Sequence, residues 1–73
     1  MENIEINLTS DKIITIHGLE EIHVLYQGEL SDVITPESIP DFAWRSDCAY
    51  SFIGREESAV VQGSMISYLY FFA

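Results

Sequence analysis

Few residues in this chain have the types that catalysis or metal binding requires. His17 and His23 are the only histidines, and Cys48 is the only cysteine. Their spacing matches no zinc-binding pattern, and the chain has neither a glycine-rich phosphate loop nor a Gly-x-Ser-x-Gly nucleophile motif. A small enzyme would need a concave site that holds one of the two histidines against a carboxylate, and no motif indicates one. We therefore expect no enzymatic activity, no cofactor and no bound metal.

The remaining reactive groups are also poorly placed for chemistry. Glu20-Glu21 and Glu56-Glu57 are neighbours in the sequence, so on a strand the two side chains of each pair would point to opposite faces. Such pairs are typical of solvated turns rather than of a convergent acid and base. Cys48 lies in an alternating apolar run, which is typical of a small core residue rather than of a nucleophile.

Acidic residues dominate the charge of the chain. Twelve Asp and Glu side chains stand against three Lys and Arg, which gives a formal net charge of −9 over 73 residues. Residues 1–37 hold eight of these carboxylates, with Lys12 as the one cation among them. Three cations cannot neutralise enough phosphates for direct binding of nucleic acid. Carboxylates along one face can instead approximate the charge density of DNA and bind a basic groove, although solubility alone could also explain an acidic surface.

Alternating apolar residues predict strands along most of the chain. Ile4, Ile6 and Leu8 alternate with polar residues, and residues 12–17 and 21–26 are rich in β-branched side chains. We expect these three runs to form an antiparallel meander. Strand character returns in residues 47–54, 58–62 and 64–72.

Two prolines interrupt this pattern between residues 29 and 47. Pro36 and Pro40 exclude a long strand or a long helix here, whereas Thr35-Pro36-Glu37 favours the start of a short helical turn. We expect a single domain over residues 1–73 that is mainly β and at most α+β. Its predicted architecture is a single small antiparallel sheet of five or six strands, with a short helical insertion around residues 31–46.

The composition indicates a folded protein of the cytoplasm. Apolar residues make up 48% of the chain, enough for a core, and Cys48 has no partner for a disulfide. The first five residues are acidic and lack the features of a signal peptide. Residues 58–73 are uncharged but too short and too polar for a membrane span. We therefore expect a cytoplasmic protein that does not contact a membrane.

One tripeptide supports a more specific hypothesis, in which the acidic chain inhibits a nucleic-acid-binding protein. Glu37-Ser38-Ile39, in an acidic and β-rich chain, resembles the Glu-Ser-Ile element of the phage uracil-DNA glycosylase inhibitors, which are small acidic DNA mimics. In that family the element inserts where the enzyme grips the DNA backbone, and an apolar pocket captures a protruding leucine of the enzyme. The resemblance implies that Glu37 and Ser38 make the backbone-mimicking contacts and that Ile39 supports the packing of the element. The size and charge are also similar to those of anti-CRISPR proteins.

These observations predict an acidic DNA-mimic inhibitor, phage-encoded if the resemblance holds and active in the host cytoplasm. Its partner would be a protein with a basic nucleic-acid-binding surface, such as a uracil-DNA glycosylase or a CRISPR effector. The expected partner-binding residues are Glu20, Glu21, Glu29, Asp32, Glu37, Ser38, Ile39, Asp41, Phe42 and Trp44.

The aromatic C-terminal run supports an alternative function. Tyr68, Tyr70 and Phe72 fall on one face of the strand predicted in residues 64–72, and the opposite face is also apolar. This pattern is typical of a central strand, or of an edge strand that a partner covers. The alternative is therefore a β-rich interaction module, either immunity- or antitoxin-like or a homo-oligomeric structural protein, and a homodimer would form through this strand.

Overall fold

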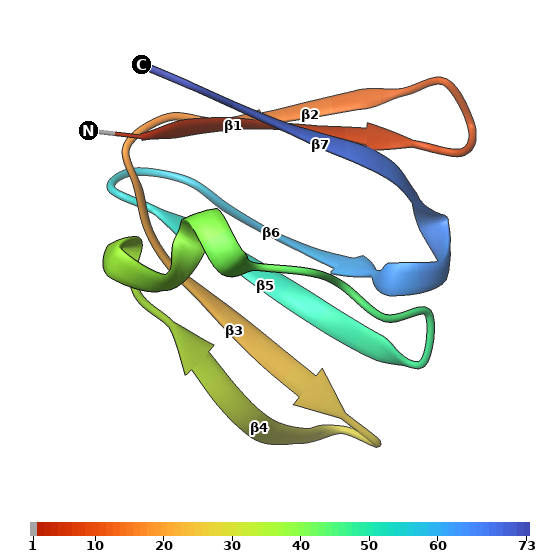
Figure 1. Ribbon diagram of the computed structural model, residues 1–73. Helices are drawn as coiled ribbons and strands as arrows, with labels where there is room; N and C mark the ends of the chain where they lie inside the picture. The colour runs from red at the N-terminus through yellow and green to blue at the C-terminus, as the bar shows by residue number, and fades with distance from the viewer. Residues whose placement is uncertain (1) are drawn as a thin grey trace.

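The chain folds into two antiparallel sheets that lie one above the other (Figure 1). The computed structural model describes residues 2–73 and, at Pro40, the backbone only. One sheet has the strand order β2-β1-β7, with β1 (Asn3–Leu8), β2 (Ile13–Ile16) and β7 (Ile66–Phe72). The other has the order β4-β3-β5-β6, with β3 (Leu19–Tyr26), β4 (Glu29–Ile34), β5 (Cys48–Gly54) and β6 (Ser58–Gln62).

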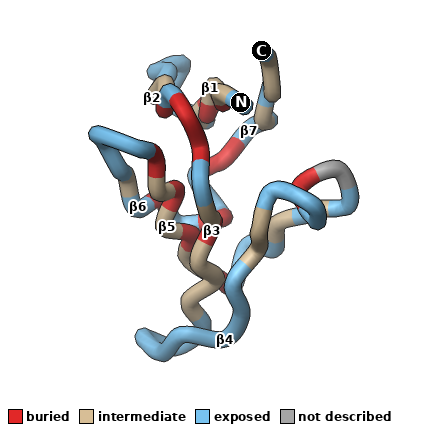
Figure 2. Tube along the Cα trace, turned by 90° about the vertical axis from the view of Figure 1, so that its left-hand side faces the viewer, coloured by how far each residue is buried: buried red, intermediate tan, exposed pale blue. Residues whose placement is uncertain are grey.

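The core fills the space between the sheets (Figure 2). Ile4 and Ile6 of β1 are fully buried, as is Phe52 of β5, and Tyr50 is 2% exposed. On β5 the buried residues alternate strictly with half-buried ones, because successive strand residues point to opposite faces. Each sheet thus contributes its apolar face to one shared core, and burial of these faces is the main source of stability.

The prediction of a mainly β, antiparallel fold is confirmed, but the single sheet and the meander are wrong. The structure has seven strands in two sheets, and β2 does not pair with β3. Gly18 adopts a φ of 63°, a conformation that glycine reaches without steric cost, and it lies where the chain passes from one sheet to the other. The physical reason is burial, since one flat sheet would leave its apolar face uncovered in a chain of this size.

Residues 29–47 differ from the prediction in two ways. Residues 29–34 form β4, which pairs with β3 at the edge of the four-stranded sheet. The helical insertion is the single 3₁₀-helix η1 (Pro36–Asp41), with Thr35 as its N-cap and Pro36 in the first turn. A second short 3₁₀ turn, η2 (Gly63–Met65), connects β6 to β7.

In the part of the chain that the structure describes, no helix has the length and apolar character needed to cross a membrane.

Candidate partner-binding surface

A hollow of about 560 Å³ lies between β4 and the η1 segment. Asp32 of β4 and Ser38 of η1 contribute to its lining, as does Asp41 at the end of η1. Phe42 and Tyr50 supply apolar surface, and their rings make an edge-to-face contact with centroids 5.4 Å apart. Arg45 also lines the hollow, which therefore combines two carboxylates and one guanidinium with aromatic surface.

Asp32 reaches this hollow because it lies on the core-facing side of an edge strand. It is opposite Val24 in the register between β3 and β4, and a bulge follows at Val24/Leu25. Its carboxylate accepts a hydrogen bond of 2.8 Å from the backbone N–H of Val33. The Asp32 side chain is exposed, and a charge on an edge strand disfavours edge-to-edge association.

The Glu37 carboxylate is fixed by the residue that precedes the helix. Thr35 Oγ1 donates a hydrogen bond of 2.7 Å to Glu37 Oε2, and the Thr35 side chain makes no cap bond to the backbone. This bond, followed by a backbone hydrogen bond at Glu37 itself, lowers the pKa of Glu37 below its usual value of 4.5. Glu37 is therefore a fixed, ionised and exposed carboxylate at neutral pH.

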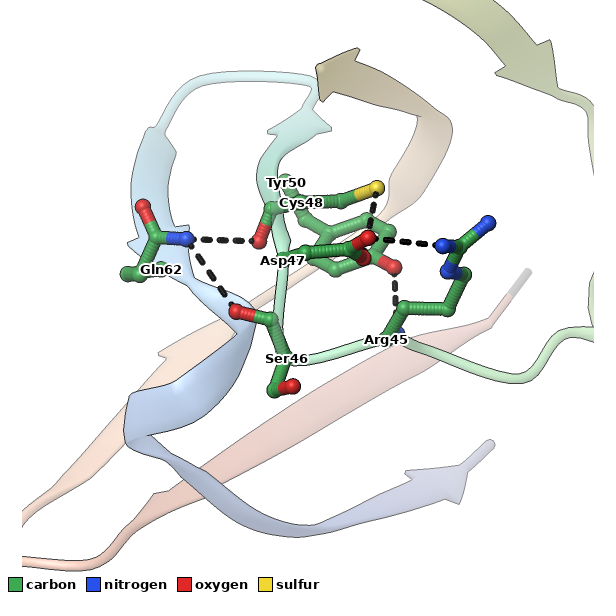
Figure 3. A network of polar contacts seen from close by, with 6 residues as sticks. All are labelled: Arg45, Ser46, Asp47, Cys48, Tyr50 and Gln62. Carbon is green, nitrogen blue, oxygen red and sulfur yellow. Dashed lines mark hydrogen bonds and ion pairs between the residues drawn. The ribbon is translucent and has the colours of Figure 1, made fainter. Parts of the chain in front are cut away.

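A polar network ties down the loop that borders the hollow (Figure 3). The backbone N–H of Arg45 donates a 2.6 Å hydrogen bond to Tyr50 Oη, and the Arg45 guanidinium donates one of 2.6 Å to Asp47. Burial raises the pKa of Tyr50, although its bond to the Arg45 backbone acts in the opposite direction. Gln62 Nε2 donates to the carbonyl oxygen of Cys48 at 3.1 Å. These bonds hold the loop against β5 and β6, which keeps the wall of the hollow in place.

Four separate segments that together carry six of the twelve carboxylates meet at one end of the molecule, which we call the acidic end. Strand register places Glu21 beside Ile53 and, one residue further on, Ile22 beside Ile34, so the chain just before β3, after β4 and after β5 meets there (Figure 1). Leu19 N–H donates to the Glu2 carbonyl oxygen at 2.7 Å, which adds the N-terminal segment. The members of the acidic end are Glu2, Glu20, Glu21, Glu37, Glu56 and Glu57. Arg55 belongs to the same end.

The structure brings together some of the predicted partner-binding residues and separates others. Glu20, Glu21 and Glu37 belong to the acidic end, while Asp32, Ser38, Asp41 and Phe42 line the hollow. Glu29 lies at the opposite end of β4, beside Tyr26. Ile39 is only 4% exposed and packs in the core, so it can support η1 but cannot present a contact surface. Trp44 is half-buried against the same core.

Both histidines lie against carboxylates, and the register between β3 and β5 places Ser51 opposite His23. His17 Nδ1 is 3.0 Å from Glu57 Oε1, and His23 Nε2 is 2.8 Å from Glu21 Oε1. The first pair borders a hollow of about 600 Å³, whose lining is Asn3, His17, Gly18, Arg55, Glu56 and Glu57. None of these lining residues has a hydroxyl or a thiol. Glu57 also accepts a bond from the backbone N–H of His17, so it joins the β5–β6 turn to the link between the sheets.

Within residues 2–73, no cluster of three or more His, Cys, Asp and Glu side chains is arranged to hold a metal ion. Comparisons with protein-family models, with curated proteins and with solved structures found no match to this chain.

Proposed function

We propose that this protein is a non-enzymatic inhibitor that presents its carboxylates to the basic nucleic-acid-binding groove of a target protein. The observation that carries the proposal is the acidic end, where segments far apart in the sequence meet with six carboxylates among their residues and Arg55 as the one Lys or Arg. A DNA duplex carries one charge per about 1.7 Å of its axis, and only a local concentration of acid approaches that density. A net charge of −9 spread evenly over the surface would give no such field.

The β4–η1 edge extends this acidic surface. Residues 29–44 include four carboxylates and no lysine or arginine, and they lie along the outside of the four-stranded sheet. Long-range attraction would steer this surface to a cationic groove, and the hollow beside Phe42 would then take up an apolar side chain of the target. In this mechanism the carboxylates set the association rate, while the apolar contact slows dissociation.

Two targets follow from the resemblance and from the size of the chain: a uracil-DNA glycosylase and a CRISPR effector. We place the action in the reducing cytoplasm, that of the host cell if the protein is phage-encoded, because Cys48 is a free, buried thiol.

The test is titration of the protein into a uracil-excision assay and into a DNA-binding assay for a CRISPR effector. We expect stoichiometric inhibition of one of them, with an association rate that falls as salt screens the carboxylates.

Glu37→Gln, which retains an acceptor for Thr35, should weaken inhibition about tenfold, equivalent to about 1.4 kcal/mol. The matched control is Asp11→Asn in the β1–β2 turn, which removes the same charge away from the acidic end. If the glycosylase and the CRISPR effector both keep full activity at excess protein, neither is the target. If Glu37→Gln and Asp11→Asn weaken inhibition equally, the acidic end is not the binding surface.

The alternative is a β-rich interaction module of the immunity or antitoxin type, or a homo-oligomeric protein. The exposure of Tyr68 (56%) and Tyr70 (54%) favours apolar self-association. Self-association of two copies of net charge −9 would not weaken as the salt concentration rises, and this separates it from binding by charge.

A further inference from the structure

The outer face of the four-stranded sheet, which points away from the core, carries apolar side chains. Residues opposite each other on antiparallel strands project to the same face, and the register places His23 of β3 opposite both Val33 of β4 and Ser51 of β5. Their neighbours along the strands, Ile22 and Phe52, are fully buried in the core. Alternation from this row defines the outer face. Its apolar members are Leu25, Leu30, Val33, Ala49, Ile53 and Val60.

Three of these apolar residues are open to solvent. Leu30 is 59% exposed, Val33 is 38% exposed and Val60 is 67% exposed, so no other part of the described chain covers them. The strand β4 is exposed along nearly its whole length (Figure 2). An antiparallel sheet with one face on the core usually turns a polar face to water. An apolar outer face therefore indicates a surface that another molecule covers.

The strands that build this face carry negative charge and no cation. The residues of β3, β4, β5 and β6 include neither lysine nor arginine, and their carboxylates are Glu20, Glu21, Glu29 and Asp32. Glu21 lies on the outer face itself, opposite Ile53, and its Oε1 is 2.8 Å from Nε2 of His23. A partner whose apolar side chains are bordered by cations is complementary to this surface, whereas a second copy of net charge −9 is not.

The middle of the outer face is built from short side chains. Ala49 and Ser51 of β5 lie between longer side chains of β3 and β6, such as Leu25 and Gln62. Because Ala and Ser are short, a partner can approach the backbone of β5 more closely than the backbones of its neighbours. A helix that lies along β5 would place its apolar stripe there and contact Leu25 and Val60 on its two sides.

We infer that the outer face of the four-stranded sheet binds an amphipathic helix of another protein, and that lysine or arginine borders the apolar stripe of this helix. The apolar stripe packs on Leu25, Leu30 and Val60, and a cation at its border pairs with Glu21. The inference goes beyond the proposed function, because it needs neither a nucleic-acid-binding target nor the hollow beside Phe42.

A synthetic helix tests the chemistry of this partner. The probe is a fluorescein-labelled peptide of leucine and lysine, about 18 residues long and with its leucines on one helical face. Two controls are a peptide with glutamate in place of lysine and a scrambled peptide of identical composition whose leucines share no face. We expect fluorescence anisotropy to show that the probe binds the whole chain at least about tenfold more tightly than either control.

Variants that keep the charge of the protein test the surface. We expect the double variant Leu30→Ser, Val60→Ser to raise the dissociation constant of the probe about tenfold or more, because it removes apolar area from the outer face. The matched control is Ile13→Ser on the three-stranded sheet, which is 58% exposed and should leave binding unchanged. Circular dichroism of each variant checks that it remains folded.

The location of the bound peptide decides the outcome. Amide chemical shifts of the isotope-labelled protein should change along β3 to β6 and stay constant along β7. Shifts confined to β7, equal binding of either control peptide, or equal effects of Ile13→Ser and the double variant would each overturn the inference. So would a wild-type dimer in sedimentation equilibrium that the double variant dissociates, because a second copy would then occupy the outer face.

Discussion

At the scale of single residues, Asn7 is the one polar side chain of the described residues that is buried without full hydrogen bonding. It is 7% exposed, and its Nδ2 finds no hydrogen-bond partner there. A buried donor left unpaired costs about 1–3 kcal/mol. We therefore expect Asn7→Leu, a change of similar shape, to raise the free energy of unfolding by about 1 kcal/mol in urea denaturation.

Asn3 provides the control for this prediction. It lies on the same strand and face, but its Oδ1 accepts a 2.8 Å hydrogen bond from the backbone N–H of Gly18. Asn3→Leu should destabilise the protein, because it leaves that N–H without its acceptor. Destabilisation by both changes would contradict the assignment of Asn7 as an unsatisfied group.

A second prediction at this scale concerns pH and the His17–Glu57 contact. Hydrogen bonds from the backbone N–H of His17 and then from its ring lower the pKa of Glu57 below 4.5. A lowered pKa in the folded state means that the stabilisation is complete above the unfolded value and is lost as the pH falls through the folded one. We expect Glu57→Gln to reduce the free energy of unfolding at neutral pH, and the difference from the wild type to close in acid.

Denaturation at several pH values measures this difference. Glu20→Gln is the matched control, because it removes an exposed charge at the same end of the molecule. A gap between wild type and Glu57→Gln that stays constant into acid would show that the carboxylate charge plays no part in this contact.

At the scale of elements, the connection between β6 and β7 depends on a close backbone approach at Gly63. A Cβ at this position would lie 1.9 Å from the carbonyl oxygen of Arg45 and 2.9 Å from that of Cys48. Both contacts are to backbone, so relief requires movement of the loop that borders the hollow. We expect Gly63→Ala to lower the free energy of unfolding by about 3 kcal/mol, measured by thermal and urea denaturation.

Ser64→Ala is the control for this prediction, because Ser64 is the exposed next residue of η2. Its substitution should change stability by less than about 0.5 kcal/mol. A stable Gly63→Ala protein with an unchanged loop would show that the contact between η2 and the loop is not tight.

Alternation predicted most strands but missed one. The runs at residues 47–54 and 58–62 match β5 and β6 almost residue for residue, because one face of each strand is buried. β4 gave no such signal, since the bulge at Val24/Leu25 shifts its register and its residues are mostly exposed. Alternation of apolar and polar residues arises where one face of a strand is buried, so it does not reveal an edge strand whose residues are mostly exposed.

At the scale of the whole molecule, the gathering of acid could not be predicted from the sequence. Alternation assigns a side chain to one face of its strand, but strand order decides which ends of different strands meet. Glu2, Glu56 and Glu57 were therefore not among the predicted residues, although they join Glu20 and Glu37 in the acidic end. The sequence could indicate an excess of acid, and the topology of the two sheets determines which acidic segments meet.

The pairing of β1 with β7 has a consequence for the folding of the nascent chain on the ribosome. Ile4 is opposite Phe71, so β1 is synthesised well before β7, the strand with which it pairs. Strands β3 to β6 are consecutive in the chain and pair among themselves, so they can assemble early. Until β7 is synthesised, the edge of β1 that β7 covers stays unpaired. The nascent chain is most prone to aggregation in that interval.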